Sequence, residues 1–587
     1  MYSLQKQLFT LALAAIGLSA ATGISHGATA TGSASISQGL EAPGNTVTTT
    51  VIGATTPTAA ASSAMSASGT WNLSTGAHAP DLADTSLWLP LSISLDSLTI
   101  STTSPRLRVS ETSETTATVF LDGEAVITLA RDEHGLNIRS TAPDTTKIAY
   151  QLTGSGTTPI TLHSRSDYKL KLTSVTLHSP DGPALNLQSA STAFIELNGT
   201  STLTDTAAMQ EHRPSDANAM DLKATLFAEG GMVISGSGAL KIEASTRHAL
   251  ASKRHLRIIE GNVTLKANAW DGIRASNAFI MDGGTLDISA LAGKGIKVDG
   301  RESRNDPLGF IAINNGTLGI NSHGKAITAS WEAKLGKTAS TDDDPDPRVT
   351  INGGTLHITT TGTPFKDTDT ADGNDSLSPE GIESKSVLTI NGGVINIAST
   401  DDSLNAGSSL ILAGGRINLI SGNADAADSN GNLNIAGGYI VARGAAFPEG
   451  AFDADTNTLA ITGGTLIGIG GSSTTPSASA STQNTLVIND NQHVGLWTLR
   501  DADGNAVFSF NLPAPPQSTM VLSAPTLTTG TTYTVVTGGT LEHVAENFHG
   551  LAIEPGPHAG GTASTSVTLN QRVTTLDTTT QPDQHGG

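Results

Sequence analysis

Carboxylate side chains recur at one position of a repeating pattern in this sequence. Glu380, Asp402 and Asp425 occupy the same place in three consecutive repeats, and Asp401 and Asp428 lie beside them. Ionised carboxylates about 5 Å apart repel one another and raise one another's pKa. A hard cation such as Ca²⁺, with its six to eight oxygen ligands, removes that repulsion. The pattern therefore predicts either a calcium site or a hydrated acidic ridge.

A second acidic group lies in a long insertion between two repeats. Asp367, Asp369 and Asp372 precede Gly373 and Asp375, a spacing that resembles part of a calcium-binding loop. The stretch lacks the aspartate spacing and the closing glutamate of an EF-hand, so it is not one. We expect either an ordered calcium loop or a mobile acidic loop here.

Basic and aromatic residues mark the earlier repeats at the same position. Lys294 and Lys325 stand where later repeats have carboxylates, and Asp271 precedes them. The lysines could pair with uronate carboxylates, or they could balance nearby aspartates. Trp270 and Trp331 each lie beside this position. An exposed indole could stack on a sugar ring, whereas a packed tryptophan would only fill space.

Short strands joined by glycine corners must position these residues. In each repeat an alternating strand leads into Gly-Gly, as at 349–354, and a second alternating strand follows at 355–359. Alternation directs every second side chain inward. Successive corners lie 22 or 23 residues apart in the regular repeats, and such a period is typical of a solenoid. The corners are anchored at Gly238, Gly261, Gly283, Asn315, Gly353, Gly392, Gly414, Gly437 and Gly463.

The pattern therefore predicts an all-β fold, a parallel β-helix with coils of about 22 residues and a small C-terminal β module. A second corner follows each anchor by roughly eleven residues, as in Asp271-Gly272-Ile273. We expect the first residue of each such triplet to point outward. Stacked strands lie about 4.8 Å apart, so these residues should form one column.

The order of segments predicts an exported, multi-part chain. Lys6 and an apolar run at 8–21 indicate a signal peptide that is too short to span a membrane. We therefore expect no membrane insertion. The predicted parts are a signal peptide (1–30), a flexible Ala/Ser/Thr linker (31–70), an N-terminal β region (71–165), the β-helix (166–483), the C-terminal β module (484–550) and a disordered tail (551–587).

Composition narrows the possible partners. The 587 residues carry a net charge of −21, so duplex nucleic acid is not an expected partner. The chain has no cysteine, which excludes disulfides, thiolate metal sites and a cysteine nucleophile.

Several motifs, taken in order, resemble the bacterial carbohydrate-binding domain-containing family of secreted β-helix proteins. They are the segments 179–184 and 235–238, the Asp-Gly-Ile and Asn-Gly-Gly repeats, and the segment 523–539. The resemblance implies a right-handed, pectate-lyase-like β-helix that binds acidic or plant-type polysaccharide with calcium. It implies no catalytic activity. Lys294, Lys325 and His248 stand where the family pattern has a corner aspartate, which counts against a continuous calcium ladder.

Two other functions stay open at this point. A polysaccharide lyase would need calcium and a lysine or arginine base with a lowered pKa, and Lys294 or Lys325 could supply that base. A structural adhesin is the third possibility.

Overall fold

The computed structural model describes residues 87–113, 115–180, 182–206, 222–300, 309–331, 347–364, 378–489, 494–512 and 519–577. Within these ranges the chain forms β-strands and contains no α-helix, which confirms the all-β prediction. Among the same residues, no helix has the length and apolar character needed to cross a bilayer. The predicted signal peptide and the predicted linker lie outside the described residues.

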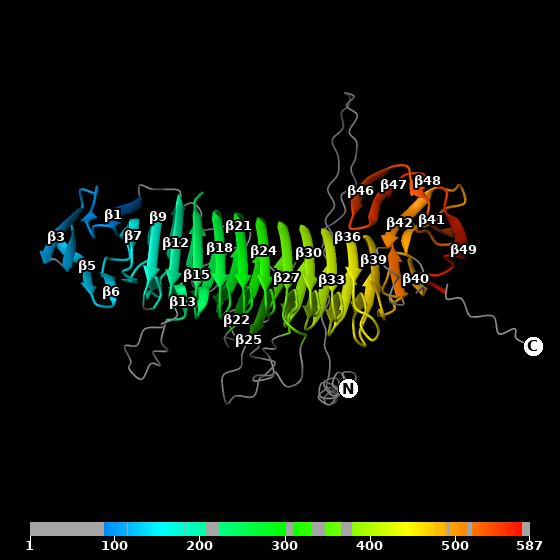
Figure 1. Ribbon diagram of the computed structural model, residues 1–587, viewed down its shortest axis with the longest axis horizontal. Helices are drawn as coiled ribbons and strands as arrows, with labels where there is room; N and C mark the ends of the chain where they lie inside the picture. Colours follow the sequence, from blue (N-terminus) through cyan, green and yellow to red (C-terminus); the bar gives the residue numbers. More distant parts are fainter. Residues whose placement is uncertain are drawn as a thin grey trace, which may run out of the picture. The chain divides into compact units, whose positions relative to one another are not determined.

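Three parallel ladders make up most of the structure, and each repeat of the chain adds one strand to each ladder (Figure 1). The first ladder contains β11 (Ala193–Asn198), β14 (Met232–Ser235), β17 (His255–Ile258), β20 (Ala278–Met281), β23 (Phe310–Ile313), β26 (Val349–Ile351), β29 (Val387–Ile390), β32 (Ser409–Leu412), β35 (Asn432–Ile435) and β38 (Leu459–Ile461).

The second ladder contains β12 (Thr200–Asp205), β15 (Ala239–Ala244), β18 (Asn262–Ala267), β21 (Thr285–Ala290), β24 (Thr317–Ser322), β27 (Thr355–Thr360), β30 (Val394–Ser399), β33 (Arg416–Ser421), β36 (Tyr439–Arg443) and β39 (Thr465–Gly470). Figure 1 shows these ten strands side by side, from cyan to yellow.

The third ladder contains β8 (Ile160–Ser164), β10 (Leu185–Leu187), β13 (Ala224–Ala228), β16 (His248–Ser252), β19 (Ile273–Ala275), β22 (Ile296–Gly300), β25 (Ile327–Trp331), β28 (Ile382–Ser384), β31 (Leu404–Ala406), β34 (Ala427–Ser429) and β37 (Phe452–Asp453). Alternate side chains from all three ladders, such as Ile382, Ile390 and Ile397, are buried in one continuous apolar core.

The Gly-Gly turn joins the first ladder to the second in each repeat. Its second glycine has a positive φ, for example +98° at Gly393 and +97° at Gly415. Only glycine adopts this conformation without steric cost. A Cβ atom on Gly393 would also lie 2.8 Å from the carbonyl oxygen of Gly354 in the preceding repeat. The turn therefore requires glycine both for its backbone conformation and for the stacking of repeats.

We expect Gly393→Ala to lower the free energy of unfolding by about 1–3 kcal/mol, because alanine is strained at positive φ and its Cβ meets backbone. Denaturant unfolding of the two proteins measures the difference. Gly422→Ala is the matched control, since a Cβ atom there meets nothing closer than 3.5 Å. Equal losses in both variants would contradict the explanation.

A row of side-chain hydrogen bonds runs beside the Gly-Gly turns. Asp282 pairs with Arg257 at 2.5 Å and accepts a 2.7 Å hydrogen bond from the Asn314 amide. The Asn352 amide donates to Asn314 at 2.7 Å, and Asn391 donates to Asn352 at 2.8 Å. These contacts tie five successive repeats together at one corner.

Antiparallel strands precede the ladders. The strands are β3 (Leu107–Ser113), β4 (Thr116–Leu121), β5 (Glu124–Asp132) and β6 (Gly135–Ser140), and β6 then pairs in parallel with β8 of the third ladder. Four further strands, β1 (Trp88–Ser94), β2 (Ile100–Ser101), β7 (Lys147–Gly156) and β9 (Tyr168–Ser179), lead into the first two ladders.

A six-stranded antiparallel sheet follows the ladders and packs against β36 and β39 through one apolar cluster. It contains β41 (Gly495–Arg500), β42 (Ala506–Leu512), β44 (Thr532–Thr537), β46 (Val544–Phe548), β47 (Leu551–Pro555) and β49 (Thr562–Thr568). Three more strands, β40 (Thr485–Asn489), β43 (Thr519–Ser523) and β50 (Val573–Asp577), extend the second ladder beyond β39.

The expectation of a disordered tail from residue 551 is wrong for residues 551–577. β47 and β49 complete the antiparallel sheet, and β50 pairs with β40. The Thr-rich, Gly-rich composition suggested disorder. Each of these strands instead needs only a few inward residues, such as Leu551 and Val567, because its partner strands supply the rest of the core.

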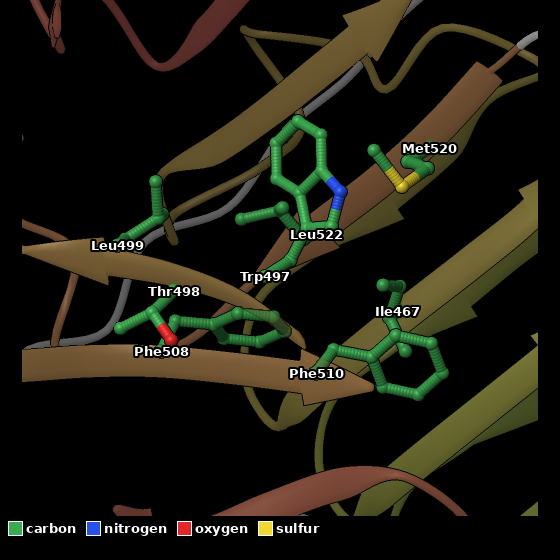
Figure 2. A pocket seen from close by; sticks show the side chains of 8 residues that line it. All are labelled: Ile467, Trp497, Thr498, Leu499, Phe508, Phe510, Met520 and Leu522. Atoms are coloured by element: carbon green, nitrogen blue, oxygen red, sulfur yellow. The ribbon is translucent and has the colours of Figure 1, made fainter. Parts of the chain in front are cut away.

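A small void lies between the antiparallel sheet and β39. Its lining includes Ile467, Trp497, Phe508, Phe510 and Met520 (Figure 2). The volume is about 10 Å³, close to the minimum for one water molecule, which would also need two to four polar partners. This void is therefore a packing gap and not a ligand site.

Candidate functional site

The residues at the second corner form one continuous row along the third ladder. The peptide N–H of Gly272 donates to the Lys294 carbonyl, and that of Gly295 donates to the Lys325 carbonyl. The same contact recurs in later repeats, with Glu380, Asp402 and Asp425 as acceptors in turn. We call the row of Asp271, Lys294, Lys325, Glu380, Asp402 and Asp425 the corner row.

The expectation that this row is exposed is wrong for most of its members. Asp271, Lys294, Lys325, Glu380 and Asp425 are all buried, and only Asp402 is partly exposed. A second row lies beside it, three residues further along each repeat, and its members Arg274, Glu383 and Asn405 contact the corner row. That second row contains Arg274, Lys297, Thr328, Glu383, Asn405, Asp428 and Asp453.

The first part of the corner row lies among buried aspartates and the cations that pair with them. Asp271 lies 3.4 Å from the His248 ring and 3.8 Å from Arg274. Arg274 also pairs with Asp299, which Lys297 approaches to 3.2 Å. Burial lowers the pKa of His248 to about 4 despite the charge of Asp271. His248 is therefore neutral at physiological pH, and the basic residues here balance aspartates.

Lys325 lies at the centre of the densest network. Its Nζ atom is 2.7 Å from Glu380 and 3.1 Å from Glu383, and its side chain is 1% exposed. Lys385 also pairs with Glu383, which accepts a 2.6 Å hydrogen bond from Thr328. Burial alone would lower the pKa of Lys325, but the charges of Glu380 and Glu383 outweigh it and raise that pKa above its usual range.

The two glutamates respond differently to the same network. Burial raises the pKa of Glu380 to about 7, because it outweighs the attraction of Lys325. For Glu383 burial acts in the same direction, but Lys325 and Lys385 together hold its pKa below the usual range. Of the two glutamates, Glu383 is thus the one whose ionised form is stabilised.

The last part of the row is an acidic cluster of Asp402, Asp425, Asp428 and Asp453. Burial is the main cause that raises the pKa of Asp425 to about 9, and the charges of Asp428, Asp453 and Glu449 add to it. The pKa of Asp402 is also raised, first by burial and then by neighbouring carboxylates.

Backbone and amide groups hold the cluster in place. The Asp425 carboxylate accepts a 2.6 Å hydrogen bond from the Gly450 N–H, and Asp402 accepts a 3.0 Å bond from the Asp425 N–H. Asn405 donates to Asp402 at 3.1 Å. Each of Asp425, Asp428 and Asp453 offers one carboxylate oxygen, and these oxygens lie within 4.8 Å of one another.

Asp401 lies beside this cluster, but its carboxylate makes different hydrogen bonds. Its carboxylate accepts a 2.7 Å hydrogen bond from the Ser378 hydroxyl and a 3.1 Å bond from the Asp402 N–H. The structure thus brings four predicted carboxylates, Asp401, Asp402, Asp425 and Asp428, to one end of the row. Glu380 instead belongs to the lysine network.

Of the two tryptophans predicted to contact sugar, the structure describes the side chain of Trp270 only. The Trp270 side chain is 40% exposed, and its ring lies 4.5 Å from the Arg247 guanidinium and 4.9 Å from the His248 ring. Trp331 ends β25, and its side chain lies outside the described residues, as do Asp367, Asp369 and Asp372.

Three charged residues of the site did not emerge from the sequence: Glu383, Asp453 and Glu449. The repeat pattern could have identified Glu383 and Asp453. Each stands one position after its corner triplet, as Asp428 does after Asp425-Ala426-Ala427. Glu449 immediately precedes the corner and had no such periodic signal.

The fold and the buried charged row define an all-β repeat protein with an acidic cluster at one end of its third ladder. Residues 135–428, a little over half of the chain, match the model of the carbohydrate-binding domain-containing proteins. This chain belongs to that family.

No curated protein matches the sequence. Among solved structures, a gadolinium derivative of the polysaccharide lyase-like protein from C. thermocellum is similar, with 19% sequence identity and a TM-score of 0.35. The similarity covers 52% of this chain and 96% of that chain.

Proposed function

We propose that this protein is a secreted, right-handed parallel β-helix that binds an acidic polysaccharide through calcium and does not cleave it. Membership of the carbohydrate-binding domain-containing family supports carbohydrate binding. The three parallel ladders, each gaining one strand per repeat, support the β-helix. Lys6 and the apolar run at 8–21 support export.

The acidic cluster is the observation that carries the proposal. Ca²⁺ binds carboxylate oxygens at about 2.3–2.6 Å, so two ligands of one ion lie at most about 5 Å apart. The oxygens of Asp425, Asp428 and Asp453 meet that limit, because they lie within 4.8 Å of one another. Calcium bound there would favour the ionised form of these aspartates and could bridge to a carboxylate of the polymer.

The polymer would reach the bound calcium through the partly exposed members of the cluster. Asp402 and Asp453 are partly exposed, whereas Asp425 and Asp428 are buried. Ca²⁺ takes six to eight ligands, so three protein carboxylates leave positions for water and for the glycan. The predicted calcium loop at Asp367, Asp369 and Asp372 and the predicted sugar contact at Trp331 stay predictions.

The lysine network argues against a lyase. A lyase base must be neutral to take a proton, so its pKa has to be lowered. Lys325 has the opposite shift, since Glu380 and Glu383 stabilise its charge. Lys294 is also buried, and its backbone N–H donates to Asp271 at 2.9 Å. Lys325 is therefore a structural cation.

Retention on immobilised polygalacturonate tests the proposed function. We expect the full-length protein to be retained with calcium and released by a chelator, with no unsaturated product absorbing in the ultraviolet. The double variant Asp425→Asn/Asp428→Asn should lose at least about tenfold in affinity, which is 1.4 kcal/mol. Product formation would mean that the protein is a lyase, and retention that survives chelation would remove calcium from the proposal.

Asp287→Asn is the matched control for this experiment. Asp287 is exposed on β21 of the second ladder, outside the acidic cluster. The control removes the same kind of charge from the protein without touching the proposed calcium ligands. It should be retained like the unmodified protein, so a loss there would indicate a general charge effect.

A further inference from the structure

Among the described residues, three large apolar side chains are exposed at one corner of the stacked repeats. Trp270, Leu291 and Phe447 are 40%, 55% and 76% exposed, and each lies in a connection between the second and third ladders. Exposed apolar side chains that occur singly need no explanation. Trp270 and Leu291 lie in adjacent repeats, and Phe447 lies further along the same corner, so the three share one side of the stacked repeats.

Phe447 is displayed by a well-anchored loop. On one side, the Ala445 N–H donates to the Ala424 carbonyl at 2.9 Å. On the other side, the Ser472 N–H donates to the Glu449 carbonyl at 2.7 Å. A Cβ atom on Gly471 would lie 1.7 Å from the Phe447 nitrogen, so the loop fits closely on its neighbour.

The same loop leads directly into the acidic cluster. It ends at Gly450, whose N–H donates to Asp425 at 2.6 Å. The repeat that contains Phe447 is 26 residues long between Gly437 and Gly463, against 23 in the repeat before it. The longer repeat therefore carries an exposed aromatic residue shortly before Gly450, whose N–H binds Asp425.

Trp270 occupies the other end of the same corner. Its ring is held by Arg247 and His248, and Asp271 follows it as the first residue of the corner row. From β19, which follows Trp270, to β37, which follows Phe447, there are six strand-to-strand steps. At about 4.8 Å for each step, the two ends are roughly 29 Å apart.

We propose that one polysaccharide chain lies lengthwise along this corner, with one sugar ring on Trp270 and another on Phe447. The C–H face of a pyranose ring is apolar, so it gains by burial against an aromatic ring. The Phe447 end lies beside the calcium site, where the polymer's carboxylates bind. The inference rests on the proposed function and adds the direction of the chain and the length that it must have.

Calorimetry with calcium and galacturonate oligomers of increasing length tests this inference. Affinity should rise with length until the oligomer spans both rings, and then level off. Phe447→Ala should lower the affinity for short and long oligomers about tenfold. Trp270→Ala should lower it about tenfold for long oligomers only. Phe447→Trp should keep the affinity of the unmodified protein.

Two measurements separate the possible failures. Val494→Ala removes an exposed apolar side chain outside this corner and should change nothing. Titration with calcium alone should be the same in all variants. If calcium fails to bind, both the proposed function and this inference are wrong. If calcium binds but affinity does not depend on oligomer length, or both alanine variants bind long oligomers normally, the lengthwise chain alone is wrong.

Discussion

Replacing Lys325 with methionine should destabilise the third ladder by about 3–5 kcal/mol, the usual cost of removing one partner from a buried ion pair. The change leaves Glu380 and Glu383 buried without the cation that lies within 3.1 Å of both. Methionine keeps most of the side-chain volume, so the loss reports charge and not a cavity. Hydrogen exchange of amides in β25 and β28 measures it, because repeat proteins open locally.

Lys385→Met is the matched control for this prediction. Lys385 pairs with the same Glu383, but its side chain is 37% exposed. Exposed pairs contribute about 0–1 kcal/mol, so the control should change little. Adding Glu380→Gln and Glu383→Gln to the Lys325 variant should restore most of the protection. Unchanged exchange in Lys325→Met would show that the network does not stabilise the fold.

Calcium affinity should rise with pH between pH 6 and 9. Each proton that calcium displaces contributes up to about tenfold in affinity for each pH unit. Burial and neighbouring carboxylates raise the pKa of Asp425 to about 9, so Asp425 holds a proton in the folded protein at neutral pH, and the pKa of Asp402 is shifted in the same direction. Ca²⁺ needs ionised carboxylates, so binding must release protons. Calorimetry in two buffers of different ionisation enthalpy counts them.

The same groups set how the calcium-free protein responds to pH. The folded-state pKa of Asp425 is raised from 3.8 to about 9, so folding is favoured by protonation. Its contribution to stability is fully present below about pH 4 and is lost as pH rises towards 9. We therefore expect calcium to raise the melting temperature more at pH 8.5 than at pH 5.5. A calcium effect that is equal at both pH values would contradict the assignment.

The sequence predicted the strands and corners well because both have local causes. Alternation assigns the inward side chains of β27 and β30, and a positive φ makes glycine necessary at Gly354 and Gly393. The stacking of Asp402 on Asp425 also follows from a constant repeat length.

Burial of the corner row could not be predicted in the same way. The repeat pattern placed Lys325 and Glu380 in one column, but Glu383, the second carboxylate that pairs with Lys325, stands outside that column. Alternation also says which side of a strand a residue faces, but not which neighbour covers it. The sequence therefore suggested an exposed lysine column, where the structure has buried ion pairs.

The hydrogen bonds from repeat to repeat also determine how the molecule resists tension. Bonds such as Gly272 to Lys294 and Gly295 to Lys325 join neighbouring repeats along the stacking direction. A pull in that direction separates the repeats one at a time, which is the weaker mode, whereas a pull along the strands loads many bonds together in shear. A glycan chain lying along the corner would pull in the weaker mode. A cation bound by both Asp425 and Asp453 would then cross-link the last two repeats of the third ladder and resist their separation.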